Sequence, residues 1–376
     1  MIVKLQEAGF GAYAVGGCVR DLLLGREPKD WDVATSARPE QVQALFPHTV
    51  GTGLQHGTVT VLIDHMPVEV TTFRREGKYS DCRRPDEVIF TERPEEDAAR
   101  RDFTVNALYW DGSGAILDFF GGQQDLRNGR LCSVGKSSAR FSEDALRMLR
   151  AARFCAQLGF RPEPQILSAM RERANRLREI SRERIGEELE QILLSDPTVG
   201  FPILVDTGCL TVVDPRLRRD PSAFTVCAAL PPDAVPRWAA LLWGCEECRE
   251  VLHGLRRDRK TISRTAFLTA HDSCDLSPYH MKQLAAEESV EAVGQLAAVR
   301  ELYGEGGLTA QFRQLQQQGQ FVTLDTLAVT GRMLLDTHQY TGKEIGRVRK
   351  WLLDQVLLGN VENDIGKLTK KLKEMP

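Results

Sequence analysis

The feature that most constrains the fold is the loss of strand patterns after Ser142. Before it, short runs of β-branched and apolar residues, bounded by Gly, Pro or Asp, alternate with helix-like runs. They predict strands at 13–15, 30–35, 58–63, 68–73 and 116–120. After it, apolar residues recur at helical spacing as far as residue 376. The sequence therefore predicts an α+β chain, with a small mixed-sheet head followed by an elongated all-helical neck, body and tail.

The composition is ordinary for a soluble globular protein. The chain has 376 residues, 42% hydrophobic and 27% charged, which predicts two to three domains. No apolar run approaches the roughly 20 residues needed to cross a bilayer. The first residues, MIVKLQEAGF, lack the apolar core of a signal peptide. Nine cysteines at irregular spacing indicate reduced thiols. We therefore expect a cytoplasmic protein that does not associate with membranes.

The charge is distributed unevenly along the chain. The net charge is −3, but residues 130–184 carry 13 Lys or Arg against 6 Asp or Glu. Such a segment can form a local RNA-binding surface. It can equally be a solvated helical surface with ion pairs between successive turns, which composition alone favours.

Two aspartates stand one residue apart in the segment KDWDVAT. In a strand, Asp30 and Asp32 would project from one face, while Trp31 and Val33 would face the core. Two neighbouring carboxylates repel each other, and two divalent cations about 3.5–4 Å apart would relieve that repulsion. Magnesium suits oxygen ligands and phosphate substrates. The alternative is a solvated pair on an edge strand.

Two further features fit a site for a nucleoside triphosphate. Gly16 and Gly17 follow a strand and open a helix, where the backbone can approach a phosphate, and Arg20 can add a bidentate contact. A plain tight turn is the alternative. On the strand at 68–73, Glu69 lies between two valines and faces the other way. Glu69 could be a third metal ligand, a base for an attacking hydroxyl, or a solvated side chain.

The segment EDALRMLRAARF predicts a helix with a polar face. Asp144 and Arg147 are three residues apart and would share that face, which Arg150 and Arg153 continue. A carboxylate beside a guanidinium matches the donor and acceptor edge of cytosine and of adenine. Uracil and guanine present the reverse order and would leave polar groups unpaired, at about 1–3 kcal/mol each. The alternative is an ordinary surface ion pair. The segment RRDFTVNALYW (100–110) also predicts a helix.

Five motifs between residues 13 and 194 occur in a specific order: GGCVRD, DWDVAT, RRDFTVNAL, EDALRMLRAARF and RERIGEEL. Together they make the chain resemble the class II tRNA nucleotidyltransferase and poly(A) polymerase family, within the DNA polymerase β-like nucleotidyltransferase superfamily. Beyond about residue 200 the resemblance rests on helical pattern alone. It implies a nucleotidyltransferase catalytic head at 1–132, a helical neck with a nucleotide-selecting helix at 133–200, and a body and tail that bind tRNA at 201–376.

The resemblance also implies roles for individual residues. Asp30 and Asp32 would hold two Mg²⁺ ions and act in catalysis together with Glu69. Asp102 would contact the ribose or cap a helix, and residues 182–185 would support the selecting helix. The nucleotide would be bound by Gly17, Arg20, Arg101, Asp144, Arg147, Arg150 and Arg153.

The implied activity is template-independent addition of CCA to the 3′ end of tRNA. CTP and ATP would be the substrates and pyrophosphate the second product, with no stable protein partner. The segments 76–90 and 56–59 resemble those of CCA-adding members of the family. Two alternatives remain open: a poly(A) polymerase or A-adding tRNA nucleotidyltransferase, and an RNA-binding protein with an inactive head.

Three further signals point to no second activity. Cys245 and Cys248 form a CxxC, but no second pair completes a zinc set, so we interpret them as small apolar residues on a helix. The His271-Asp272 pair lacks the other residues of a metal phosphohydrolase. The basic segment 366–375 either contacts the tRNA backbone or forms a solvated face.

Overall fold

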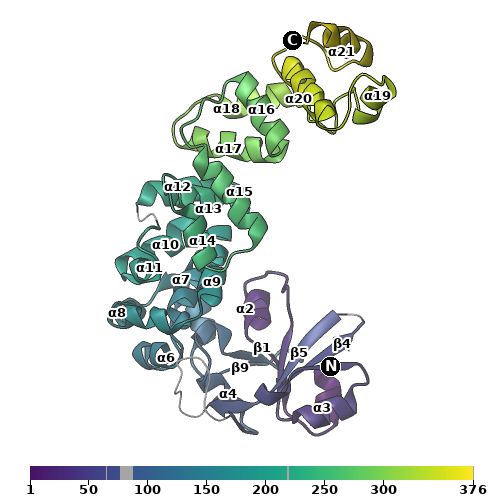
Figure 1. The fold of residues 1–376 in the computed structure, drawn as a ribbon. Coiled ribbons are helices and arrows are strands. Elements are labelled where there is room, and N and C mark those ends of the chain that lie inside the picture. Colours follow the sequence, from purple (N-terminus) through teal and green to yellow (C-terminus); the bar gives the residue numbers. More distant parts are fainter. Residues whose placement is uncertain (65, 77–87, 218–219, 376) are drawn as a thin grey trace. The chain divides into compact units, whose positions relative to one another are not determined.

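A computed structural model describes residues 1–64, 66–76, 88–217 and 220–375 (Figure 1). The chain forms two compact units, Met1–Arg219 and Asp220–Pro376, and each is described by itself. The first unit contains the head and the neck predicted from the sequence. The three-part division of the chain remains a prediction.

The head is built on a mixed sheet of seven strands: β1 (Ala12–Val15), β2 (Asp32–Thr35), β3 (Thr49–Gly53), β4 (Thr58–Ile63), β5 (Met66–Thr72), β8 (Leu108–Trp110) and β9 (Ile116–Asp118). Their order is β3-β4-β5-β2-β1-β8-β9. Only β2 and β5 run parallel, and every other neighbouring pair is antiparallel. The predicted mixed sheet is therefore confirmed, and each of the five predicted segments contains a strand. The strand predicted at 30–35 begins only at Asp32, so the expectation that Asp30 lies on it beside Asp32 is wrong.

Short helices and hydrophobic clusters cover both faces of the sheet. The helical elements are α1 (Ile2–Glu7), α2 (Gly17–Leu23), α3 (Pro39–Leu45), η1 (Leu54–His56), α4 (Pro94–Ala99), η2 (Thr104–Asn106) and α5 (Gly122–Arg127). Leu5 of α1 and Val42 of α3 pack with Val33, Val59 and Val70 on one face. A second cluster contains Val15, Ala34, Phe73, Ala98, Ala107, Tyr109 and Val134. Two separate pairs complete the strands, namely β6 (Arg74–Glu76) with β7 (Val88–Phe90) and β10 (Arg130–Leu131) with β11 (Arg161–Pro162).

Two other local expectations are wrong. Residues 100–110 do not form a helix: they contain the single turn η2 and then β8, which pairs with β1 on one side and β9 on the other. Tertiary pairing overrides the short helical pattern here, because aromatic residues at 109 and 110 suit a strand between two others. Trp31 does not face the core. It precedes the first residue of β2, is 36% exposed, and lies 6.5 Å from Trp110 between ring centroids.

The rest of the first unit is helical, as predicted. Its elements are α6 (Ser137–Glu143), α7 (Leu146–Leu158), α8 (Pro164–Arg173), η3 (Ala174–Glu179), α9 (Arg182–Leu194), α10 (Pro197–Asp206) and α11 (Cys209–Val213). Gly159 ends α7 with φ 72°, a left-handed conformation that glycine adopts without steric cost. Packing of α7 against both α9 and α10 buries Leu149, Leu189 and Phe201.

The secondary structure described in the second unit consists of helices, joined by turns and loops. It contains α12 (Pro221–Ala229), α13 (Ala234–Leu241), α14 (Cys248–Gly254), α15 (Arg259–Ala270), α16 (Pro278–Glu287), α17 (Val290–Leu302), α18 (Leu308–Gln317), α19 (Gly331–Asp336), α20 (Lys343–Leu357), α21 (Ile365–Lys371) and η4 (Leu372–Glu374). Cys248 is buried at the start of α14, whereas Cys245 precedes the helix. In the described part of the chain, no group of three or more His, Cys, Asp or Glu could hold a metal ion. No helix there is long and apolar enough to cross a membrane.

Candidate active site

A cleft of about 630 Å³ lies within the first unit. It is formed by the start of α2, the loop before β2, the segment around η2, and α7. Nine residues singled out from the sequence line it: Gly16, Gly17, Arg20, Asp30, Asp32, Arg101, Asp102, Arg150 and Arg153. Folding therefore brings four of the five motifs to one polar surface.

The carboxylates occupy the start of β2. Asp32 is half-buried as the first residue of this strand, and Asp30 is exposed in the bend before it. Asp32 is in register with Glu69 of the parallel strand β5. Burial raises the pKa of Asp32, Glu69 and Asp30 raise it further, and Arg101 opposes them. Asp30 and Asp32 supply two oxygen donors and concentrated negative charge on one surface, and such a pair suits a hard divalent cation.

The Gly-Gly turn places α2 against the cleft. Gly16 has φ 76°, and a Cβ at this position would come within 3.1 Å of Nη1 of Arg101. The positive φ therefore favours glycine, and any larger residue would also have to displace the end of the Arg101 side chain slightly. Arg20, on α2, is only 5% exposed. Its Nε donates to Asp21 over 2.9 Å, and its Nη1 donates to Oδ1 of Asn106 over 2.8 Å.

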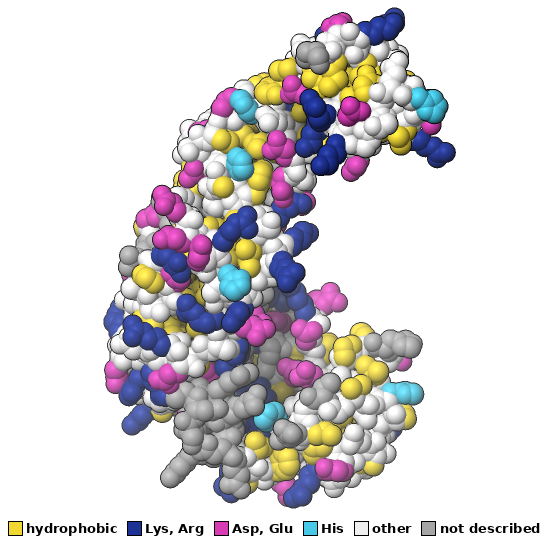
Figure 2. Space-filling model, in the orientation of Figure 1, with side chains coloured by type: hydrophobic (Ala, Val, Ile, Leu, Met, Phe, Trp, Pro, Cys, Tyr) yellow, Lys and Arg dark blue, Asp and Glu magenta, His cyan; other side chains and the backbone are white. Residues whose placement is uncertain are grey.

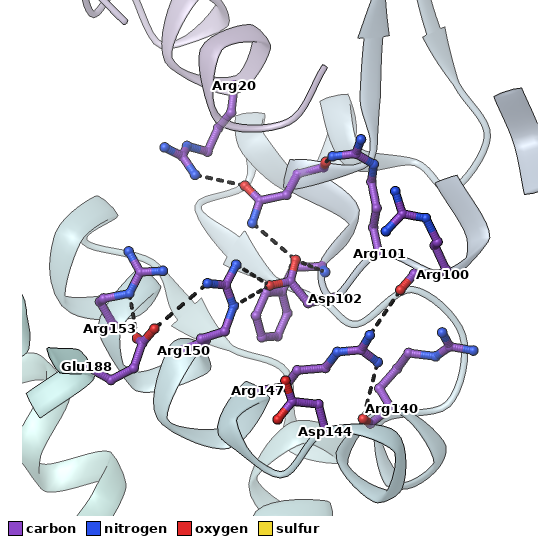
Figure 3. Close-up of polar contacts among 12 residues, drawn as sticks. Arg20, Arg100, Arg101, Asp102, Arg140, Asp144, Arg147, Arg150, Arg153 and Glu188 are labelled. Atoms are coloured by element: carbon purple, nitrogen blue, oxygen red, sulfur yellow. Dashed lines mark hydrogen bonds and ion pairs between the residues drawn. The ribbon is translucent and has the colours of Figure 1, made fainter. Parts of the chain in front are cut away.

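A chain of polar contacts continues from Asn106 to α7 (Figure 3). Asn106 donates from Nδ2 to Oδ1 of Asp102 over 3.3 Å. The other carboxylate oxygen of Asp102 accepts from Nε of Arg150 over 2.8 Å and lies 2.7 Å from its Nη2. Burial would raise the pKa of Asp102, but the guanidinium of Arg150 outweighs it and the pKa is lowered. Asp102 therefore stays ionised and fixes Arg150.

Three arginines of the cleft surround one aromatic ring. The guanidinium carbons of Arg20, Arg150 and Arg153 lie 5.4, 5.2 and 4.2 Å from the ring centroid of Phe154. Such contacts favour a cation over an aromatic face. Glu188 of α9 accepts from Nε of Arg153 over 2.6 Å and lies 3.8 Å from Nη1 of Arg150. The Phe154 ring and the Glu188 carboxylate therefore fix the positions of the positively charged guanidinium groups.

Arg101 is held by a buried carboxylate that the sequence reasoning did not single out. The side chain of Asp97 on α4 is completely buried. It accepts from Arg100, from Nη2 of Arg101 over 3.4 Å and from the hydroxyl of Tyr109 over 2.5 Å. The Tyr109 hydroxyl in turn accepts from Nε of Arg101 over 3.1 Å. This network fixes the direction of Arg101.

Asp144 and Arg147 are not among the residues that line the cleft. Asp144 precedes α7 with φ −138°, so the expectation that both residues lie on one helix is wrong. Its carboxylate accepts from the Leu146 N–H and from Arg184, each over 2.9 Å. An aspartate just before a helix satisfies a free backbone N–H, which explains the earlier break in the helix. Arg147 donates to Glu143 over 2.5 Å.

Other sequence expectations have mixed outcomes. Glu69 is exposed and adjacent to Asp32 in the sheet, but it is not among the lining residues. Arg184 lies in the segment expected to support the selecting helix and contacts Asp144, which precedes α7; the supporting role stays a prediction. Of the segment 76–90, residues 77–87 lie outside the described residues. Sequence reasoning did not single out Asn106 or Glu188, although Asn106 lies in the motif RRDFTVNAL and Glu188 lies in RERIGEEL. A polar residue next to apolar ones inside such a motif could have identified both.

A mixed sheet that carries neighbouring carboxylates at a strand end, beside a Gly-Gly turn and several fixed arginines, defines the chain as a nucleotidyltransferase of the polymerase β-like class. Two family models match: the poly A polymerase head domain over residues 12–132, and the probable RNA and SrmB-binding site of polymerase A over residues 159–220. The class is thus supported independently for the head and for the helical region after it.

Comparison with individual proteins narrows the class. The chain is 36% identical over 391 residues to the CCA-adding enzyme of Lactococcus lactis subsp. lactis (strain IL1403). This match covers 100% of the chain and 96% of the relative. It is 50% identical over 211 residues to the CCA-adding enzyme of Lactococcus lactis subsp. cremoris (strain MG1363), a match that spans 55% of this chain and about half, 52%, of the relative. The chain belongs to the family of CCA-adding enzymes, which are tRNA nucleotidyltransferases.

A solved structure agrees with this assignment. The crystal structure of the Bacillus stearothermophilus CCA-adding enzyme in complex with CTP superposes with a TM-score of 0.85 at 32% identity. The match covers 99% of this chain and 95% of that one. The likeness therefore extends through the helical region, where the sequence motifs had ended.

Proposed function

We propose that this chain adds CCA to the 3′ end of tRNA, transferring CMP twice and AMP once from CTP and ATP and releasing pyrophosphate. The observation that carries the proposal is the cleft itself, in which Asp30 and Asp32 share one surface with Arg20, Arg101 and Arg150. Full-length similarity to a CCA-adding enzyme supports it.

The carboxylates would hold the catalytic metal. Asp30 and Asp32 supply its oxygen ligands, and Glu69, next to Asp32 across the sheet, is placed either to complete the set or to accept the proton of the attacking hydroxyl. When bound, two Mg²⁺ ions would lower the pKa of the RNA 3′-hydroxyl and stabilise the leaving pyrophosphate. The residues themselves position the hydroxyl for in-line attack on the α-phosphate.

The arginines would bind the triphosphate. Arg20 and Arg101 come from the head, and Arg150 and Arg153 come from α7. Their internal contacts leave the guanidinium groups oriented before substrate arrives, so little conformational entropy is lost on binding. Gly17 lets the phosphates approach the backbone closely.

Asp144 and Arg147 would select the base through the Watson–Crick edges of cytosine and adenine. Because Asp144 contacts Arg184 and Arg147 contacts Glu143, selection requires each to exchange its present partner for the base. The exchange breaks both ion pairs, so only a base that pairs with both released groups can offset its cost. UTP and GTP offer no compensating pair and would leave the exchange unfavourable.

The remaining parts of the chain would serve the RNA. Residues 1–132 would carry catalysis, residues 133–200 nucleotide selection, and residues 201–376 tRNA binding. All tRNAs must be served, so contacts to shape and backbone suit this task better than base readout. A tRNA-processing role fits the cytoplasmic location expected from the sequence.

The test is a nucleotide-addition ladder. Purified protein and Mg²⁺ are given tRNA transcripts that end before CCA, after C and after CC, with CTP alone, ATP alone or both. We expect two C and one A, followed by arrest. A long A ladder would instead identify a poly(A) polymerase, which the name of the matching head family keeps as the second candidate. A single A on the CC-ended transcript alone would identify an A-adding enzyme.

Two variants separate the steps. Asp30→Ala should abolish addition while tRNA binding is retained, because Asp30 is exposed and its loss leaves the fold intact. Addition that survives in Asp30→Ala would show that Asp30 does not act in catalysis, whereas a wild-type chain that binds tRNA but adds no nucleotide would have an inactive head. Asp144→Ala should relax discrimination against UTP, and unchanged discrimination would show that this residue does not select the base.

A further inference from the structure

The pair Cys245 and Cys248 is a motif that the proposed function leaves unused. Both cysteines line a cavity of about 500 Å³ in the second unit, which is walled by the start of α14 and the end of α15. Cys248 is 2% exposed, whereas Cys245 is half-buried in the segment before α14. The interpretation of both as small apolar residues on a helix is therefore wrong for Cys245, which precedes the helix and reaches solvent.

The backbone brings the two cysteines close together. Glu246 and Glu247 form a turn between them. The ends of such a four-residue turn lie within about 7 Å between Cα atoms, and a disulfide joins Cα atoms about 4.4–6.8 Å apart. Burial raises the pKa of the Cys248 thiol, and Cys245 raises it further through its charge, so the two groups lie within electrostatic reach of each other. A bond between the two sulfur atoms is therefore compatible with this backbone.

The surroundings favour a pair of thiols over a metal site. In the described part of the chain, no group of three or more His, Cys, Asp or Glu could hold a metal ion. All eight cysteines described there are thiols without a disulfide. Two of these eight, Cys245 and Cys274, are partly exposed, and of the two Cys245 alone has another cysteine within three residues. A partly exposed thiol next to a buried one suits an attacking and a resolving cysteine.

The cavity carries a local excess of negative charge. Glu246, Glu250 and Asp272 line it, and Arg249 adds a single positive charge. Glu247 adds a further carboxylate, which accepts from the thiol of the first cysteine over 3.9 Å. Figure 2 shows Lys and Arg together with Asp and Glu on the visible face of the second unit, so the acidic group is a local feature. A local negative potential attracts cations, so the site favours a cationic reagent over an anionic one.

We infer that Cys245 and Cys248 form a reversible thiol–disulfide site whose reaction partners are small cationic disulfides. Cys245 gives its proton to water, and its thiolate attacks one sulfur of the reagent, so that a mixed disulfide forms and one small thiolate leaves. Cys248 then gives its proton to water and attacks the Cys245 sulfur, so that the protein disulfide forms and the second small thiolate leaves. The two small thiolates take up the two protons, and two electrons pass from the protein to the reagent. The inference does not depend on the proposed function of the cleft.

The test measures disulfide formation in the full chain carrying Cys82→Ser and Cys274→Ser. These changes remove a cysteine outside the described residues and the other partly exposed thiol. The cationic cystamine is compared with the anionic 3,3′-dithiodipropionate by intact mass and by mapping of the peptide 245–248. Each rate is divided by the rate of the same reagent with 2-mercaptoethanol, which corrects for intrinsic reactivity. We expect the loss of both thiols without retained reagent. The corrected rate should be at least about tenfold higher for cystamine at about 0.02 M salt, and the ratio should fall at about 0.5 M.

Variants separate the parts of the reaction. Cys248→Ser should retain half of the reagent as a mixed disulfide on Cys245. Cys245→Ser should react at least about tenfold more slowly, because the remaining thiol is buried. Changing the exposed Glu246 and Glu250 to Gln should reduce the preference for cystamine, whereas Glu287→Gln, an exposed control on α16, should not. The inference is wrong if both thiols stay reduced, if the parent chain retains the reagent as a mixed disulfide, or if the two reagents give equal corrected rates.

Discussion

Asp97 provides the sharpest test of how the fold supports the cleft. Its completely buried carboxylate accepts from the Arg74 backbone N–H, from two nitrogens of Arg100, from Arg101 and from the hydroxyl of Tyr109. Asp97→Asn keeps the shape but removes the charge. The side chains of Arg100 and Arg101 are only 16% and 18% exposed, so both would be left without their buried counter-charge.

The magnitude follows from this burial. Removing one partner of a buried ion pair costs about 3–5 kcal/mol, because the remaining charge stays out of water. We expect Asp97→Asn near the lower limit, since the amide can still accept one hydrogen bond, and Asp97→Ala near the upper. The matched control on the same helix is Glu95→Gln. Glu95 is 56% exposed beside an exposed Arg93, so its loss should cost about 0–1 kcal/mol.

The effect should depend on pH in one direction. Burial would raise the pKa of Asp97, but Arg100 and Arg101 outweigh it and the pKa in the folded state is lowered. In the unfolded chain the same carboxyl titrates near its ordinary value of about 3.9. The stabilisation is therefore complete above about pH 4 and is lost as the pH falls towards the lowered folded pKa. The difference between wild type and Asp97→Asn should be largest at pH 7 and shrink in acid.

The assay is urea unfolding of the full chain, with hydrogen exchange at β1 and β8 reporting on the head. Because Asp97 orients Arg101, the KM for CTP should rise together with the loss of stability. A cost below about 1 kcal/mol for Asp97→Asn, or a cost that grows in acid, would refute the reasoning.

Three further predictions concern the cleft. Removal of divalent metal with EDTA should abolish nucleotide addition and Mg²⁺ should restore it; full activity without metal would show that Asp30 and Asp32 do not act as ligands. Asp32→Asn should abolish addition yet raise the Tm of the metal-free protein, because it removes a carboxylate whose raised pKa reports unfavourable burial and repulsion; a lowered Tm would contradict this. Glu188→Gln should raise the KM for CTP about tenfold, because it releases Arg153. Glu187→Gln changes the exposed neighbour and should leave the KM unchanged. Equal effects of the two variants would contradict the role of Glu188.

Much of the fold was readable from local patterns. The strands at 58–63 and 116–120, the Gly-Gly turn and the end of α7 at Gly159 follow from residue spacing and from the conformations glycine allows. The change from strands to helices after Ser142 was visible for the same reason. These features depend on neighbours a few residues apart, which the sequence displays directly.

Predictions failed where a short pattern fitted two structures. Residues 100–110 have an apolar spacing compatible with a helix, but the sheet needs a strand between β1 and β9 and takes 108–110. Asp144 looked like a helical residue, but its side chain binds the Leu146 N–H and breaks the helix before it. In the first case pairing with distant strands decided the conformation, and in the second a hydrogen bond from the backbone two residues further along did so.

The sequence by itself determined which chemical groups the chain carries and which secondary structures hold most of them: Asp32 at a strand, Arg20 after a Gly-Gly turn, Arg150 on a helix. Only the tertiary structure decided their partners. Arg150 contacts Asp102 across 48 residues, Asp144 contacts Arg184 across 40, and Arg20 contacts Asn106 across 86. The physical reason is that a buried charge must find a counter-charge wherever packing brings one, and packing joins segments whose distance along the chain carries no signal.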